Sequence, residues 1–302
     1  MAAAWLNMAI ALVLAPLLVG IIQRTKALVA GRTGAPLLQP YHDLAKLLRK
    51  GAVYSRTTTW VFRAGPVVGL ASVLSALVLL PFGSAPALLS FEGDLVLLAY
   101  LLGLMRFFTV VAALDTGSSF EGMGASREVQ FAALAEPALF LGLATLARQT
   151  GSLSLSGIFA SVSGDGWLHA GPALALVAVA LGIVFLAENC RIPFDDPATH
   201  LELTMIHEVM VLDHGGPDLA FILYGASLKL WILGALLVGL VLPVRTGHAG
   251  ADNAVTLAGM FALAVGVGLV ESMMARLRLL RVPQLLVGAA VLSAFAFVLI
   301  LG

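Results

Sequence analysis

The chain has 302 residues, of which 60% are hydrophobic and 11% are charged, and its mean hydropathy is +1.00. This composition is typical of polytopic α-helical membrane proteins and excludes a sizeable soluble domain. The formal net charge is zero, and the basic residues do not form runs interleaved with aromatic residues, which argues against a nucleic-acid partner.

Apolar runs of about 20 residues recur along the whole chain, the length that an α-helix needs to cross the hydrocarbon core. We therefore predict an all-α membrane protein with a single domain, residues 1–302. Its eight transmembrane helices are expected near residues 2–22, 63–83, 91–114, 128–148, 172–190, 218–243, 252–275 and 283–301.

The basic residues between these spans are distributed unevenly. The loops after spans 2, 4 and 6 hold only Arg148 and Arg245, whereas the odd-numbered loops hold all the other loop cations. By the positive-inside rule, the odd-numbered loops are cytoplasmic and both termini lie on the opposite side of the membrane.

Residues 36–50, between spans 1 and 2, have leucines and a tyrosine at helical spacing, opposed by charged residues. This pattern predicts an amphipathic helix that lies at the cytoplasmic membrane surface. The polar face carries Asp43, Lys46, Arg49 and Lys50.

A second short helix is expected at 197–213, in the acidic loop between spans 5 and 6. Pro197 suits a first helical position, Asp195 or Asp196 can cap the helix, and Gly215 follows its end. It is too short to cross the membrane.

Five charged residues fall within or near the ends of spans, where an unpaired ion is costly: Arg106, Glu136, Glu188, Lys229 and Glu271. Glu136 precedes Pro137, which frees a backbone carbonyl and can admit water. This favours a role for Glu136 in proton transfer. The alternative is a structural ion pair with Arg106 or Lys229.

The acidic loop adds further titratable groups, Asp195, Asp196, Glu202, His207 and Glu208. Together with Glu188 they form a series along which protons could pass. The alternative is a solvated loop that faces water or the basic patch of a partner.

The chain offers no sign of catalytic or metal chemistry of its own. Cys190 is the only cysteine, so the chain cannot form an internal disulfide or ligate an iron–sulfur cluster by itself. His200, His207 and His214 are spaced seven residues apart, too far along a helix to share a metal ion. No catalytic nucleophile, phosphate-binding loop or dinucleotide motif is present, and any redox centre is expected on another subunit.

Three arginines, Arg276, Arg278 and Arg281, lie at the cytoplasmic end of span 7. They either fix the membrane topology or dock a peripheral protein.

Several motifs together resemble a known family. The segments LLQPYHDLAKLLRK and AENCRIPFDDPATHLEL, with the eight-span layout, resemble the subunit 1 family of respiratory complex I. GSSFEGMGASREVQFAALAEPALF, RIPFDDPATHLELTMIHEVMVL and ESMMARLRLLRVPQLL resemble, more closely, the membrane-anchor branch in formate hydrogenlyase and related energy-converting nickel–iron hydrogenases. The resemblance covers nearly the whole chain.

This resemblance implies a stator in a bacterial or archaeal cytoplasmic (inner) membrane. The chain would dock the large and small hydrogenase subunits and couple their electron transfer to proton or sodium movement in antiporter-like membrane subunits. The nickel–iron centre and iron–sulfur clusters would lie on those partners. The residues expected to contribute to docking are Lys46, Arg49, Arg127, Arg191, Arg276, Arg278 and Arg281.

The resemblance also implies roles for single residues. Glu136 matches the mid-helix glutamate of the family, Glu188 and Arg191 match the pair that opens its AExxR-PFD motif, and Glu202 and Glu208 match the acids that follow. These acids would form a buried proton funnel.

Complex I members tend to have AETNRAPFDLPEAESELV in this region, whereas this chain has Asp196 and His200 there. The difference favours the hydrogenase branch. The main alternative is a quinone-binding subunit of a complex I-like NADH:quinone oxidoreductase. Two different classes of protein also stay open, an independent ion carrier and a purely structural anchor, and the lack of an internal repeat argues against the carrier.

Overall fold

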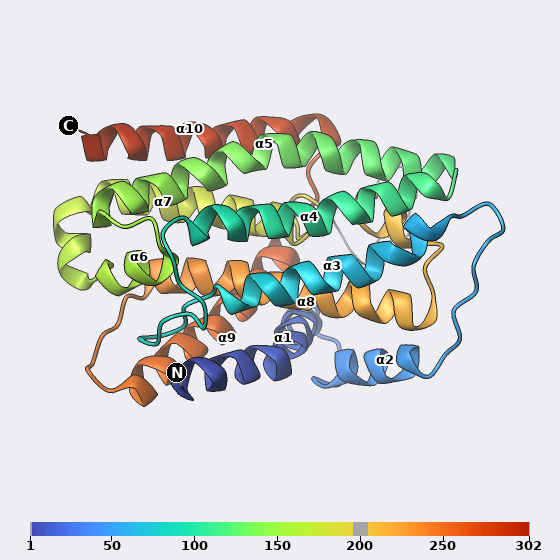
Figure 1. The fold of residues 1–302 in the computed structure, drawn as a ribbon, viewed down its shortest axis with the longest axis horizontal. Helices are drawn as coiled ribbons and strands as arrows, with labels where there is room; N and C mark the ends of the chain where they lie inside the picture. The colour runs from blue at the N-terminus through green and yellow to red at the C-terminus, as the bar shows by residue number, and fades with distance from the viewer. Residues whose placement is uncertain (1, 196–204, 302) are drawn as a thin grey trace.

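The computed structural model describes residues 2–195 and 205–301, and the regular secondary structure of this part is helical apart from one isolated β-bridge between Phe82 and Ala85 (Figure 1). Eight of its helices are long and apolar enough to cross a membrane, which confirms the predicted number of spans. They are α1 (Ala2–Val29), α3 (Trp60–Val78), α4 (Asp94–Asp115), α5 (Ser119–Thr150), α7 (Gly164–Glu188), α8 (Gly216–Val241), α9 (Ala249–Met273) and α10 (Val282–Leu301).

Four shorter elements lie in the connections. Helix α2 (Gln39–Leu48) falls within the segment predicted to form the amphipathic helix, and none of its residues is buried. Helix α6 (Leu155–Ser161) was not expected from the sequence. Two short 3₁₀ helices, η1 (Glu208–Val211) and η2 (Leu279–Arg281), precede α8 and α10.

The bundle has two chemically different ends. Both chain termini lie at one end, together with α6, and we call this the terminal end (Figure 1). The loops at the other end, the basic end, contain α2, η1 and η2 and nearly all of the loop cations.

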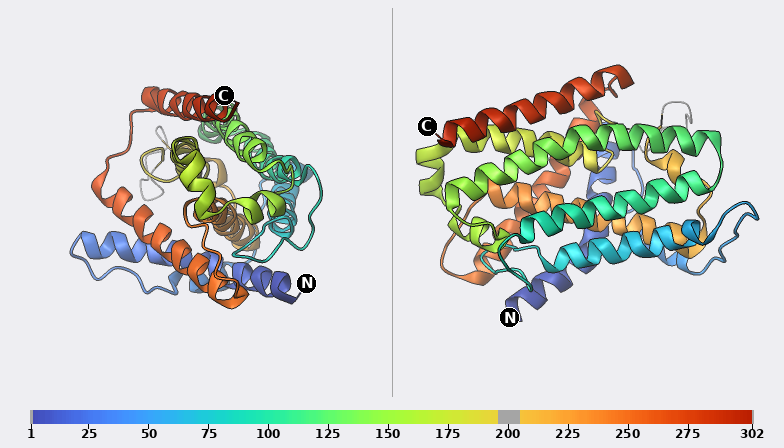
Figure 2. Two further views of the ribbon diagram at one scale, coloured as in Figure 1. Left: turned by 90° about the vertical axis from the view of Figure 1, so that its left-hand side faces the viewer. Right: turned by 45° about the horizontal axis from the view of Figure 1, so that its top comes forward.

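Helix α8 lies at the centre of the bundle, because 67% of its apolar window is buried, more than in any other span. It packs against α1, α2, α3, α7 and α9. Helix α10 instead packs against α5 and α7, and the connection from α9 to α10 crosses the molecule (Figure 2).

The kink in α1 is held by two tyrosines from other helices. Pro16 lacks the N–H that would bond to the carbonyl of Leu12. Tyr224 of α8 donates its hydroxyl to that carbonyl at 2.8 Å, and Tyr41 of α2 donates to the carbonyl of Val13. Helix α2 approaches α1 closely at Gly20, where a Cβ atom would lie 2.1 Å from the carbonyl oxygen of Leu37.

The structure also differs from the sequence prediction at the start of α5 and in the acidic loop. Helix α5 begins at Ser119, nine residues before the predicted span, because its first turns are too polar to raise the local hydropathy. The predicted helix at 197–213 is wrong for residues 205–213, where only η1 forms. The carboxylate of Asp195 accepts the N–H groups of Ile206 and His207, at the far end of the acidic loop. The predicted residues 197–204 lie outside the described part.

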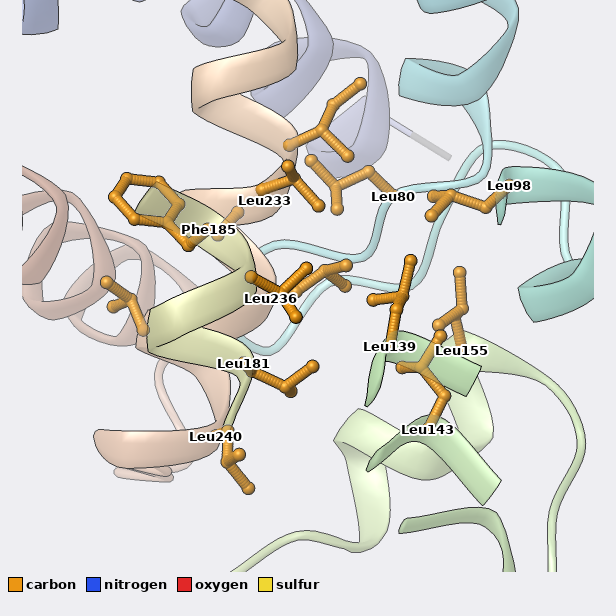
Figure 3. Close-up of a cluster of buried hydrophobic side chains, with 14 of the residues drawn as sticks. Leu80, Leu98, Leu139, Leu143, Leu155, Leu181, Phe185, Leu233, Leu236 and Leu240 are labelled. Carbon is orange, nitrogen blue, oxygen red and sulfur yellow. The ribbon is translucent and has the colours of Figure 1, made fainter. Parts of the chain in front are cut away.

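The largest hydrophobic core fills the middle of the bundle and extends to the terminal end. Leucines from α5, α7 and α8 meet there with Leu80 and Leu155 of the terminal-end connections (Figure 3). The polar groups described next lie between this core and the basic end.

Candidate functional site

Arg106, from the middle of α4, lies at the centre of a group of three carboxylates. Its guanidinium is 2.7 Å from the carboxylate of Glu136 and 3.4 Å from that of Glu128, both on α5, and it also donates to Glu188 at the end of α7. The alternative of a Glu136–Arg106 ion pair, left open by the sequence, therefore describes the geometry. A fork of N–H donors allows one arginine to hold several carboxylates.

Two further groups join this cluster from α8 and the acidic loop. The Lys229 ammonium is 3.7 Å from Glu188, and the His207 imidazole is 3.7 Å from Glu128. We call Arg106, Glu128, Glu136, Glu188, His207 and Lys229 the Arg106 cluster.

The protonation state of His207 sets the total charge of the cluster. Three carboxylates and two permanent cations leave one negative charge when His207 is neutral, and none when it is protonated. Burial opposes a charge on His207, but Cys190 and Glu128 beside it outweigh this effect and raise its pKa to about 10. These neighbours favour the imidazolium, and with a protonated His207 the charge of the cluster is balanced.

A second cluster forms around Glu271, whose side chain is fully buried at the end of α9. Lys26 of α1 is 2.8 Å from one carboxylate oxygen, and Arg191 is 3.5 Å from the other. We call Lys26, Arg191 and Glu271 the Glu271 cluster. With two cations and one acid, the Glu271 cluster has one excess positive charge. The Arg106 cluster has none when His207 is protonated.

The acidic loop is tied to the bundle on both sides. Arg276 is 3.0 Å from Asp195, and Arg127 donates to the carbonyl of Met205 at 2.8 Å. Three of the residues predicted to dock a partner, Arg127, Arg191 and Arg276, thus make contacts within the chain. The other four, Lys46, Arg49, Arg278 and Arg281, are exposed at the basic end.

A cavity of about 460 Å³ separates the two clusters. It lies between α1, α2, α8, α9 and the acidic loop, and its walls include Glu188, Lys229 and His207 on one side and Lys26, Arg191 and Glu271 on the other. Asp43, Asp195 and Glu208 also line it, whereas no aromatic side chain of the described residues does, apart from the His207 imidazole. The ionisable groups suit ordered water, but most of the lining surface is apolar and includes Val19, Leu44, Leu223 and Leu230.

A smaller space of about 70 Å³ reaches the Arg106 cluster from the outside of the bundle, between α4 and α5. It is lined by Arg106, Glu136 and Glu188 together with Tyr100 and Phe140. Glu188 therefore lines both spaces, and the side chain of Glu136 is 48% exposed at the outer one. The cluster forms a polar connection from the cavity to the lipid-facing surface of the bundle.

Sequence reasoning missed two members of this site. Glu128 was placed at a span end, but the early start of α5 carries it into the bundle, about two turns from Glu136. Lys26 was assigned to a loop, but α1 continues through it to Val29. Neither position could be recognised from hydropathy, because polar turns at helix ends lower the average.

Two predicted residues, Asp196 and Glu202, fall outside the described part of the chain. Within residues 2–195 and 205–301, no group of three or more His, Cys, Asp and Glu side chains is arranged to hold a metal ion. The candidate site is thus a network of charged and titratable groups.

The chain thus combines eight spans with an acid cluster centred on Arg106 and a cavity beside it. The model of the family described as NADH dehydrogenase matches residues 1–302. This chain belongs to the NADH dehydrogenase family. The resemblance to subunit 1 of complex I, stated from the sequence motifs, is confirmed.

Relatives within the NADH dehydrogenase family include proteins of two hydrogenase systems. The chain is 34% identical over 294 residues to formate hydrogenlyase subunit 4 of Escherichia coli (strain K12), which covers 95% of this chain and 94% of that protein. It is 35% identical over 234 residues to hydrogenase-4 component C of the same strain, covering 78% and 73%. A subunit of the NADH-quinone oxidoreductase of Rubrobacter xylanophilus is 31% identical over 169 residues, or 55% of this chain and 51% of that one.

A solved structure shares the fold. A chain of the membrane-bound sulfane sulfur reductase, an archaeal respiratory membrane complex, superposes with a TM-score of 0.85 at 22% identity, covering 99% of this chain and 98% of that chain. The likeness extends over the whole bundle, so the two chains share one fold from end to end.

Proposed function

We propose that this chain is the membrane subunit of a formate hydrogenlyase- or hydrogenase-4-type complex, in which it couples electron transfer on a peripheral arm to proton or sodium movement. The match to formate hydrogenlyase subunit 4 over nearly the full length of both chains supports this assignment. The chain itself carries no redox centre in this proposal. The nickel–iron centre and the iron–sulfur clusters lie on the hydrogenase large and small subunits.

The observation that carries the coupling role is the position of Glu188. It lines the 460 Å³ cavity on one side and the 70 Å³ space on the other, and it contacts both Arg106 and Lys229. A charge change at the cavity alters the balance of the Arg106 cluster, because carboxylates that share one cation have interdependent proton affinities. The cluster responds by taking up or releasing a proton at Glu136.

The exit for that proton lies at the side of the bundle. Glu136 is half-exposed on a face that is otherwise apolar, with Tyr100, Leu104 and Phe107 exposed nearby on α4. A carboxylate facing lipid is costly, so this face is suited to an antiporter-like membrane subunit that supplies a polar partner.

The basic end faces the cytoplasm in this proposal, and both termini face the other side of a bacterial or archaeal inner membrane. The exposed cations Lys46, Arg49, Arg278 and Arg281 are available there to contact the peripheral arm. Arg127, Arg191 and Arg276 contribute indirectly, because they hold the acidic loop in place.

Glu136→Gln tests the coupling role. Glutamine keeps the size and the hydrogen bonding of the side chain but cannot carry a proton. We expect the complex to assemble and evolve hydrogen in inverted membrane vesicles while proton movement, followed with a pH-sensitive dye, falls at least tenfold. The matched control is Glu92→Gln at the terminal end, where an exposed glutamate accepts the N–H of Leu153. Unchanged proton movement per hydrogen in Glu136→Gln would contradict the proposal.

The cavity also favours a second candidate, a quinone-binding subunit. Its volume lies within the range of small-molecule sites, and α2 forms one wall, so a membrane-soluble ligand has access beside this helix. The mostly apolar lining surface also favours this candidate, whereas the many ionisable groups and the lack of Phe, Tyr or Trp among the described lining residues weigh against a quinone. Reduction of a soluble quinone analogue by the purified complex, without hydrogen evolution, would replace the first proposal by this one.

A further inference from the structure

A groove outside the Arg106 cluster lies at the basic end, where α1 meets the end of α9. It has a volume of about 920 Å³ and is lined by Lys26, Arg32, Thr33 and Ser272, with Ala27, Val29, Ala30 and Gly34 forming its apolar wall. Only small side chains occupy this wall, and the two cations and the Thr33 hydroxyl complete the lining, whereas the Ser272 hydroxyl donates to the carbonyl of Gly268 at 2.7 Å.

The groove is a defined feature of the fold, because the chain after α1 folds back on the helix. Arg24 donates to the carbonyl of Thr33, which ties the returning segment to α1. Gly34 lies so close to the helix that a Cβ atom there would be 2.3 Å from the Cβ of Ala27. The last carbonyls of α1 are also satisfied, since the N–H groups of Ala30, Gly31 and Arg32 bond to residues 26–28.

The groove lies at the depth of lipid headgroups. Helix α1 has 28 residues and is about 42 Å long, whereas the hydrocarbon core is about 30 Å thick, so its last turns emerge at the interface. Leu28, Val29, Met273 and Met274 are exposed beside the groove, an arrangement that suits contact with acyl chains. Two cations and the Thr33 hydroxyl match the phosphate of a phospholipid, and the apolar residues beside them match its acyl chains.

We propose that this groove binds the headgroup of an anionic phospholipid through Arg32, Thr33 and Lys26. The proposal goes beyond the coupling role, and it connects the lipid to that role through Lys26. This residue lines both the groove and the 460 Å³ cavity, and it contacts Glu271 at 2.8 Å. A lipid phosphate competes with Glu271 for the Lys26 ammonium, so the lipid alters the charge at the cavity wall.

The test uses the intact complex in nanodiscs that contain a photoactivatable phosphatidylglycerol or, in parallel, a photoactivatable phosphatidylcholine. Mass spectrometry then maps the adducts. We expect the anionic probe to label residues 27–34 and 272–274 about fivefold more than the zwitterionic probe, and Arg32→Gln to remove most of this difference, as expected for one basic residue near the membrane surface.

Two further variants sharpen the test. Glu271→Gln releases Lys26 toward the groove, so it should increase the labelling, in the opposite direction to Arg32→Gln. Arg56→Gln is the matched control, because Arg56 is also exposed at the basic end but lies outside the groove, and it should change nothing.

Equal labelling by the two probes, or labelling that Arg32→Gln does not reduce, would overturn the proposal. Displacement of the probe by inorganic phosphate would assign the site to a free anion instead. Labelling of the isolated chain but not of the complex would assign the groove to an acidic segment of a partner subunit. None of these readouts depends on hydrogen evolution, so the lipid site can fail while the coupling role stands.

Discussion

The two halves of the bundle are built from different chemistry. The half toward the basic end holds the Arg106 and Glu271 clusters and the cavity between them. The half toward the terminal end holds the leucine core (Figure 3), and its polar groups bond locally, as Asp94 does to Ser154 and to the N–H of Leu155. Along α8 the change occurs within about one turn, from Lys229 to Leu233.

This difference bears on the coupling role proposed for the chain. Leu233, Leu236 and Leu240 of α8 are buried over about 10 Å of helix, a layer in which an isolated charge is strongly disfavoured. Within the described residues, the charged groups of the clusters thus extend from the cavity to the side of the bundle at Glu136. Under the proposed coupling role, a proton taken up at the cavity would therefore be released at Glu136, at the side of the bundle.

The largest loss of stability is expected when Arg106, the cation at the centre of the charged half, is removed. Arg106→Gln leaves Glu128 and Glu188 buried beside Glu136 without their shared cation, so we expect a loss of about 3–5 kcal/mol in the free energy of unfolding. Thermal unfolding of the purified chain measures this. Arg148→Gln, at an exposed position in the last turn of α5, is the control and should change the stability by less than about 0.5 kcal/mol. A variant as stable as the control would show that the cluster is solvated.

The apolar half should respond in stability alone. Leu143→Ala removes a fully buried side chain and leaves a cavity, which we expect to cost about 2 kcal/mol. This value is at the low end of the range because lipid provides little hydrophobic driving force between helices. The ratio of protons moved to hydrogen evolved should stay at the wild-type value, and a changed ratio would place the proton path in this half.

The smallest expected effect is a pH dependence of the free energy of unfolding, which arises in the charged half from His207. The pKa of His207 is raised from its ordinary value of 6.5 to about 10 by Cys190 and Glu128, against the opposing effect of burial. Its ion pair therefore contributes stability that is fully present below pH 6.5 and is lost as the pH rises through 10. Because the imidazole is partly exposed, we expect only about 1 kcal/mol. His207→Gln should lack this loss when thermal unfolding is followed from about pH 6 to about pH 10.

His214→Gln is the matched control for this experiment. His214 lies in the same loop as His207, and its ring stacks on Phe62 of α3. Burial lowers the pKa of His214, so this side chain is neutral across the alkaline range. Its variant should keep the alkaline loss of stability that the wild type shows. An equal loss in wild type and in His207→Gln would exclude a charged His207.

Sequence reasoning was most successful where the bilayer imposes its own rule. Spans must be apolar and long, so all eight were found, and the pairing of Glu136 with Arg106 was among the alternatives because both lie inside spans. The additional partners of Arg106 were not foreseeable, since Glu128 and Glu188 come from α5 and α7 and their approach depends on helix packing. The structure of residues 205–213 was predicted wrongly because it depends on non-local bonds. The carboxylate of Asp195 accepts N–H groups eleven and twelve residues further along the chain, and no local sequence pattern indicates such bonds.

The two tyrosine hydroxyls at the Pro16 kink have a mechanical consequence. A proline kink usually acts as a flexible joint, but here the carbonyls of Leu12 and Val13 are fastened to α8 and α2. Three of the helices that surround the cavity are thereby joined at one level of the membrane. A displacement of α2 therefore acts on α1 and α8 through these bonds, and in the proposed complex a partner bound at the basic end could alter the cavity without entering it.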